Sequence, residues 1–287
     1  MSTPTGPSPP PLIFIFDQLR TRSHLFHRFF STHPSLTPLW HPYIKSAFLG
    51  PERHTQYARN SIARYKEVME DMAPLYGADT YASCGEELSA AVANLKSKHP
   101  DQSLLVNEHT LNILKQDLMF ALSRNEAIPS PLPVNPTVLP DSLYTSLTPI
   151  LLIRNPLHQL RSSYTAACKT STMRPGDEDF HHTTTLTFSR FLYDHFASRG
   201  RTPIVVDGED VLWRTREVAE GVCGRLGLDA GQVKDEWEVI AEGSYGSNEA
   251  VVRAYMAEVL ASTGVKREGV DVSVSPQFGR DRCVKFC

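Results

Sequence analysis

The stretch from residue 12 to residue 30 constrains the fold more than any other part of the chain. It begins with five consecutive apolar residues, Leu12 to Phe16, which predict a buried strand, and a polar turn from Asp17 to Ser23 follows. Beyond the turn, apolar residues recur at steps of one, three and four, as on one face of a helix: Leu25, Phe26, Phe29 and Phe30. The chain therefore starts with a strand, a tight loop and a helix.

The same alternation of short apolar strands and helices continues along the chain. Further strands are predicted at 103–107, 150–153 and 203–206, and helices at 53–72, 86–98, 111–123, 183–198, 211–226, 230–242 and 247–262. Another helix is predicted to start at Pro156, with Leu157, Leu160 and Tyr164 on its inner face. Residues 32–50 read as a loop, and the proline-rich residues 129–149 as an irregular surface segment or lid. This order predicts an α/β fold with three layers (α/β/α) around a central, mostly parallel sheet.

Composition limits the classes of function. The chain has 287 residues and a net charge of −3, so we expect one α/β domain over 12–287 after a disordered, proline-rich lead over 1–11. The charge gives no indication of a nucleic-acid partner or an anionic membrane surface, and no stretch has transmembrane length. The 5 cysteines are dispersed and show no metal-ligand spacing with histidine. We therefore expect a cytoplasmic protein without a metal site.

The first loop has the residue types of an anion site. Arg20, Thr21, Arg22 and Ser23 lead into a helix N-terminus, where free N–H groups and the helix dipole favour negative charge. The alternative is a solvated basic turn that is capped by Ser23.

A second basic residue follows the predicted strand at 150–153. Arg154 stands directly after four buried aliphatic residues, and Ser162 lies eight residues later, two turns into the next helix. The two side chains can reach a common phosphate from opposite sides. Otherwise Arg154 forms an internal salt bridge, with Asp207 or Glu209 as its partner.

Polar residues also end the predicted strand at 103–107. His109 is a candidate general base at that strand end, and Glu108 is the alternative proton-transfer group if His109 is packed against a backbone carbonyl.

Taken in order, these segments resemble those of sulfotransferases that use 3′-phosphoadenosine 5′-phosphosulfate (PAPS), a family with a P-loop-like fold. The segment IFIFDQLRTRSHLFHRF is similar to the strand, loop and helix that bind the 5′-phosphosulfate, LLIRNPLHQLRSSY to the 3′-phosphate motif, and LLVNEHT to the strand end with the catalytic base. The resemblance implies that Arg20 contacts the bridging oxygen and that His109 is the base. It also implies a cofactor site formed by Arg20, Thr21, Arg22, Ser23, His24, Arg154 and Ser162.

Departures from the family pattern leave a second function open. Leu19 replaces the usual proline, His24 replaces a small hydroxyl residue, and the glycine- and lysine-containing loop near the family's C-terminus is not visible. The first hypothesis is sulfuryl transfer from PAPS to a hydroxyl or amine of a small, largely apolar molecule. In the second, the fold has lost PAPS and catalyses cofactor-free isomerisation or cyclisation with His109, Glu108, His24 and Arg20. A third hypothesis is a non-catalytic nucleotide- or partner-binding protein.

Overall fold

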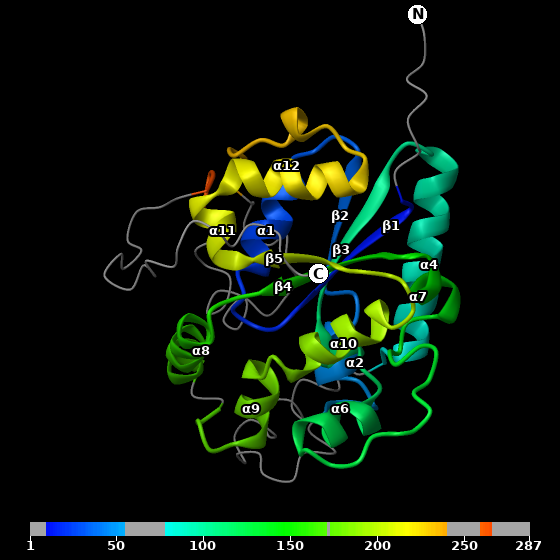
Figure 1. The fold of residues 1–287 in the computed structure, drawn as a ribbon, viewed down its shortest axis with the longest axis vertical. Coiled ribbons are helices and arrows are strands. Elements are labelled where there is room, and N and C mark those ends of the chain that lie inside the picture. Colours follow the sequence, from blue (N-terminus) through cyan, green and yellow to red (C-terminus); the bar gives the residue numbers. More distant parts are fainter. Residues whose placement is uncertain (1–9, 55–77, 171–172, 240–258, 266–287) are drawn as a thin grey trace, which may run out of the picture.

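The computed structural model describes residues 10–54, 78–170, 173–239 and 259–265. Within these ranges, five strands form one parallel sheet in the order β2-β3-β1-β4-β5. The strands are β1 (Leu12–Asp17), β2 (Leu36–Trp40), β3 (Ser103–His109), β4 (Thr148–Ile153) and β5 (Ile204–Asp207). The apolar run near the start of the chain therefore forms the central strand (Figure 1).

Helices cover both faces of this sheet, which confirms the predicted α/β/α class (Figure 1). They are α1 (Ser23–Phe30), α2 (Ile44–Phe48), α4 (Tyr81–Lys98), α5 (Thr110–Ile113), α6 (Gln116–Ser123), α7 (Asp141–Ser146), α8 (Pro156–Thr170), α9 (Glu178–Thr184), α10 (Thr187–Ala197), α11 (Gly208–Trp213) and α12 (Thr215–Leu226). A short 3-10 helix, η2 (Ala230–Gln232), follows α12.

Alternate residues of β1 divide the hydrophobic core into two parts. Phe14 and Phe16 pack with residues of α4, α6, α7 and α10 on one face of the sheet. Ile13 and Ile15 pack with residues of α1, α11 and α12 on the other face. All four side chains are fully buried, and burial of each contributes roughly 1.5–3 kcal/mol to folding. This anchoring holds the polar loop after β1 at a defined place on the sheet edge.

The strand β2 was not predicted, because its sequence reads as part of a loop over 32–50. It contains Pro38, which has no N–H to donate, and its apolar residues do not alternate regularly. Among the described strands, β2 lies at the edge of the sheet and pairs only with β3, and an edge strand tolerates proline. The prediction of a loop over all of 32–50 is therefore wrong for residues 36–40 and also for α2.

The orientation of α8 also differs from the prediction. The helix starts at Pro156 as expected, but Leu157, Leu160 and Tyr164 are 70%, 40% and 51% exposed. Its buried residues are instead Gln159, Ser163, Ala166 and Ala167. The amide of Gln159 donates a hydrogen bond to the Leu19 carbonyl (3.0 Å). The face of α8 that lies toward the loop after β1 therefore makes a polar contact there.

Several predicted helices are shorter or divided. The region 111–123 splits into α5 and α6 because Leu114 is extended and pairs with Thr137, which lies in the predicted irregular segment. Residues 183–198 and 211–226 are likewise each shared between two helices, and 129–149 includes α7 and the start of β4. Within 230–239 only η2 is helical, so the helix predicted there is wrong for these residues.

Some predictions lie outside the described residues. These are the helix at 53–72 beyond residue 54, the helix at 247–262 up to residue 258, and the proline-rich lead up to residue 9. Within the ranges that the structure covers, no helix combines the length and the apolar character that crossing a membrane requires.

Candidate functional site

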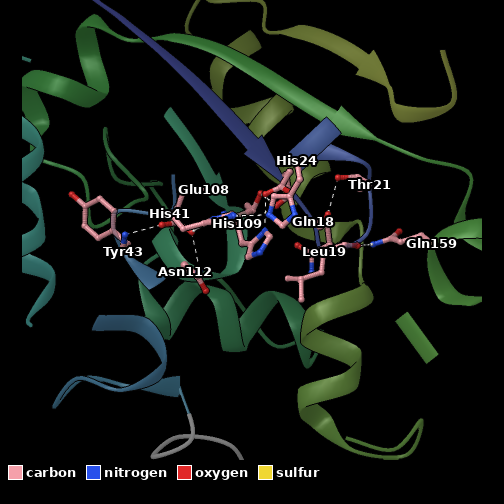
Figure 2. A network of polar contacts seen from close by, with 12 residues as sticks. Gln18, Leu19, Thr21, His24, His41, Tyr43, Glu108, His109, Asn112 and Gln159 are labelled. Atoms are coloured by element: carbon pink, nitrogen blue, oxygen red, sulfur yellow. Dashed lines mark hydrogen bonds and ion pairs between the residues drawn. The ribbon is translucent and has the colours of Figure 1, made fainter. Parts of the chain in front are cut away.

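Polar side chains gather where β2, β3 and β1 end, at the carboxyl edge where parallel α/β sheets bind ligands. Asp17 is the last residue of β1 and pairs in register with His109, the last residue of β3. His41 follows directly after β2, and His24 is the second residue of α1. Figure 2 shows the three histidines grouped beside the loop that carries Gln18, Leu19 and Thr21.

His109 is held by a buried carboxylate. Its Nδ1 lies 2.8 Å from Oδ1 of Asp17, and both side chains are buried. Burial disfavours the imidazolium, but the charge of Asp17 and its hydrogen bond outweigh this effect and raise the pKa of His109. With Nδ1–H donated to Asp17, Nε2 keeps its lone pair. This is the arrangement that orients a histidine as a general base.

Glu108 has a different role from His109. Its Oε1 accepts hydrogen bonds from the His109 N–H (2.8 Å) and from the amide of Asn112 (2.8 Å), and it lies 3.2 Å from Nδ1 of His41. Its Oε2 accepts the N–H of Tyr43 (2.7 Å). Because both oxygens are engaged and the side chain is fully buried, Glu108 positions His41 and the adjoining backbone. This geometry does not support proton transfer by Glu108 itself.

His24, His41 and His109 form one cluster, in which sequence reasoning missed His41. Nε2 of His24 lies 2.9 Å from Nε2 of His41, and each of the three rings offers a nitrogen within 4.8 Å of the other two. Burial, the other two histidines and Arg20 lower the pKa of His24 well below its ordinary value. The three ring nitrogens therefore form a group that could hold a metal ion. The signal for His41 was its place after a strand, and that strand was not recognised.

The loop between β1 and α1 has an unusual backbone. Arg20 and Arg22 have φ angles of +67° and +66°, in the left-handed region that non-glycine residues rarely adopt. The loop is held from the side of α8, since Nε of Arg20 donates to Oγ of Ser162 (2.9 Å) and Nη1 of Arg154 donates to the Arg20 carbonyl (3.0 Å). The structure thus brings together three of the predicted cofactor residues.

Two other predicted cofactor residues lie deeper in the loop. Thr21 is fully buried, and its hydroxyl donates to the Gln18 carbonyl (2.8 Å), so its side chain shapes the turn. Ser23, the first residue of α1, is also buried. Arg22 is the N-cap residue and provides no side-chain cap, so the alternative of a turn capped by Ser23 is wrong. The first N–H groups of a helix have no acceptor within the helix.

The carboxylate of Glu209 contacts three basic side chains. Glu209, in the first turn of α11, lies 2.7 Å from Nε of Arg154, 3.2 Å from Nη2 of Arg22 and 3.1 Å from Nδ1 of His158. Burial favours a raised pKa for Glu209, but the bonds to Arg154 and the charge of Arg22 lower it below its ordinary value. The internal salt bridge considered for Arg154 is therefore present, with Glu209 as its partner.

The neighbouring Gly208 allows this close approach. A Cβ atom at that position would lie 2.1 Å from the Thr21 carbonyl oxygen, well inside contact distance. Only glycine lets the start of α11 pack directly on the β1–α1 loop, and this packing places Glu209 among the basic side chains.

Comparisons with known proteins give only distant similarities. No protein-family profile and no curated protein matches the chain. The sulfotransferase domain of the Synechococcus PCC 7002 olefin synthase is 17% identical, with a TM-score of 0.39 over 92% of this chain and 83% of that domain. The sulfotransferase domain of the curacin biosynthetic pathway is 14% identical, with a TM-score of 0.46 over 85% of this chain and 83% of that one.

A mouse sulfotransferase, SULT7A1, was solved with 3′-phosphoadenosine 5′-phosphate (PAP). It is 9% identical, with a TM-score of 0.40 over 89% of this chain and 68% of that chain. These three solved proteins are sulfotransferases or sulfotransferase domains. At these identities and TM-scores the likeness decides nothing about the activity of this chain.

Proposed function

We propose that the chain is an enzyme that transfers a sulfuryl group from PAPS to a hydroxyl or amine of a small, largely apolar molecule. The observation that carries the proposal is the Asp17–His109 pair at the same sheet edge as the basic β1–α1 loop. A base and an anion-binding loop are the two parts that such a transfer requires from the protein.

The residues of the loop suit the charge of the nucleotide. Arg22 and Arg154 already hold the carboxylate of Glu209 between them, and a phosphate of the nucleotide would bind there by displacing it. Arg20, Ser162 and the first N–H groups of α1 add further donors on the same side. When bound, PAPS supplies the sulfuryl group and leaves as PAP.

The roles of the side chains follow from their contacts. His109 takes the acceptor proton at Nε2 while Asp17 holds Nδ1, so the ring keeps one tautomer and one orientation. Arg20 and the α1 N–H groups stabilise negative charge that develops on the leaving oxygen. Positioning and electrostatics therefore account for the proposed catalysis.

The test is PAP binding, measured by thermal shift and by calorimetry. We expect a saturable stabilisation of about 2.7 kcal/mol at a concentration one hundred times the dissociation constant. It should be lost in Arg20→Gln, which removes the charge beside Ser162. It should persist in Arg190→Gln, which removes an arginine whose side chain is 73% exposed on α10. Wild-type protein without any shift at millimolar PAP would refute the proposal.

One observation favours the second function, cofactor-free isomerisation or cyclisation. Glu209 neutralises the basic side chains that a phosphate would need, and it lies within 3.2 Å of both arginines. In this function His109, His24 and Arg20 polarise a carbonyl-bearing apolar substrate, and Glu108 positions His41. It predicts turnover without nucleotide, together with no PAP binding in wild type. A strict requirement for PAPS would exclude it.

A further inference from the structure

We propose that His24, His41 and His109 bind one Zn²⁺ ion. The three side chains come from the start of α1, from the residue after β2 and from the end of β3. Adjacent parallel strands thus place them at one sheet edge, although they lie far apart in the sequence (Figure 2). Three histidines with a further position left for water or a ligand form a known type of zinc site.

The distances suit such an ion. With Zn–N bonds of 2.0–2.1 Å, two ligands of a tetrahedral ion are about 3.3 Å apart. Nε2 of His24 and Nε2 of His41 are 2.9 Å apart, and the ring nitrogens of all three lie within 4.8 Å of one another. Small side-chain rotations would therefore bring the three nitrogens to a common ion. Because His41 donates its Nδ1–H to Glu108, the proton between the two Nε2 atoms belongs to His24, and it would move to Nδ1 of His24 when the ion binds.

Two buried carboxylates orient the rings as they do around bound zinc. Oε1 of Glu108 lies 3.2 Å from Nδ1 of His41, and Oδ1 of Asp17 lies 2.8 Å from Nδ1 of His109. Metal-bound histidines almost always donate their second ring nitrogen to such an acceptor. The Nε2 atoms of His41 and His109 are therefore the ones left for the ion. These two carboxylate contacts distinguish the cluster from a chance contact between two histidines.

The charges nearby also suit a divalent cation. Asp17 and Glu108 are both fully buried, so their charges are poorly screened by water. Arg20 opposes them, since its charge acts on both His24 and His109. Two carboxylates against one guanidinium leave a net negative charge around the three rings.

This site rests on the histidine cluster and is independent of nucleotide binding. An ion on Nε2 of His109 would use the lone pair that base catalysis requires, so the ion-bound chain should be inactive in sulfuryl transfer. Binding of PAP at Arg20 and Ser162 is measured separately, and its failure would leave the zinc inference unaffected.

The experiment is calorimetric titration of the full-length, metal-free protein with Zn²⁺. Absorption spectra of the Co²⁺ form provide a second readout that needs no variant. We expect one Zn²⁺ per chain and the visible bands of tetrahedral Co²⁺ without sulfur charge transfer. His41→Ala should weaken binding by more than about 100-fold, and Glu108→Gln by about 10–100-fold. Circular dichroism will show whether each variant is folded.

The matched control is His99→Ala, which removes an exposed histidine outside the cluster and should bind Zn²⁺ like wild type. Cys168→Ser tests the exposed thiol on α8 and should also leave binding unchanged. No binding to wild type, no tetrahedral Co²⁺ spectrum, or equal affinity in folded His41→Ala would each overturn the inference.

Discussion

Replacement of Glu209 by glutamine tests whether this carboxylate occupies the place of a ligand phosphate. Glutamine has nearly the same shape but no charge, so Arg22, Arg154 and His158 lose their common counter-ion. Hydrogen bonds to charged groups contribute about 1.5–3 kcal/mol each, and the side chains here are only 12–20% exposed. The three bonds are not additive, so we expect Glu209→Gln to lower the free energy of unfolding by about 2–3 kcal/mol.

The same substitution should strengthen nucleotide binding. If PAP binds as proposed, one of its phosphates must displace Glu209 from Arg22 and Arg154 in the wild-type protein. Removal of one competing charge-assisted bond of about 1.4 kcal/mol corresponds to a tenfold change in affinity. We therefore expect the dissociation constant of PAP to fall by about tenfold in Glu209→Gln. Urea denaturation measures the stability, and calorimetry at low ionic strength measures the affinity.

Opposite signs of the two effects are the diagnostic result. The control is Glu220→Gln, which removes a carboxylate that is 60% exposed on α12 and pairs with Arg216. It should change the stability by less than about 0.5 kcal/mol and should leave the affinity unchanged. The reasoning is refuted if Glu209→Gln loses stability while its affinity for PAP stays the same or weakens.

Three further predictions concern stability. Burial lowers the pKa of His27 from 6.5 to about 3, and Nε2 faces the Leu105 carbonyl at 3.0 Å. The unfolded chain therefore binds a proton that the folded chain does not. Below about pH 6.5 this difference lowers the free energy of unfolding by about 1.4 kcal/mol per pH unit. In urea titrations between about pH 6 and 4, His27→Gln should remove this contribution to the pH dependence of stability. Gly208→Ala should cost about 1–3 kcal/mol by thermal denaturation, because the new methyl group collides with the Thr21 carbonyl. Phe16→Ala should cost about 3–5 kcal/mol in urea denaturation, since its ring is fully buried in the core.

Each of these has an outcome that contradicts it. An unchanged pH slope in His27→Gln would mean that the folded chain protonates this ring as readily as the unfolded chain. Wild-type stability of Gly208→Ala would mean that α11 does not pack on the loop. A cost below about 1 kcal/mol for Phe16→Ala would place that ring outside a well-packed core.

Much of the fold was readable from local patterns. Four of the five strands begin or end within a few residues of their predicted positions, because uninterrupted apolar runs such as Leu12 to Phe16 have no other stable place than the middle of a covered sheet. The loop after β1 and the helix start at Pro156 were also readable, since both depend on residue types at fixed local spacing.

The site was readable only in part. His109 was singled out because it ends an apolar strand. Arg154 was singled out because a guanidinium after buried aliphatic residues must have an anionic partner, and that partner is Glu209. Asp17 ends β1 in the same way, but its role depends on its pairing with His109 across β1 and β3, a register that no local pattern reveals.

Tertiary structure alone decided the rest. β2 forms because its residues pair with the edge of β3, and the proline-containing sequence of β2 does not predict this pairing. The end of β2 places His41 beside the other two histidines. Apolar spacing predicts that Leu157 lies on the buried face of α8, but Leu157 is exposed. Gln159 lies on the buried face and donates a hydrogen bond to the loop after β1. Strand formation depends on residues that are close in sequence. The Asp17–His109 pair and the contact between the three histidines depend instead on which strands lie side by side. Local sequence patterns therefore predict the layers of the fold, whereas the packing of distant segments brings the side chains of the candidate site together.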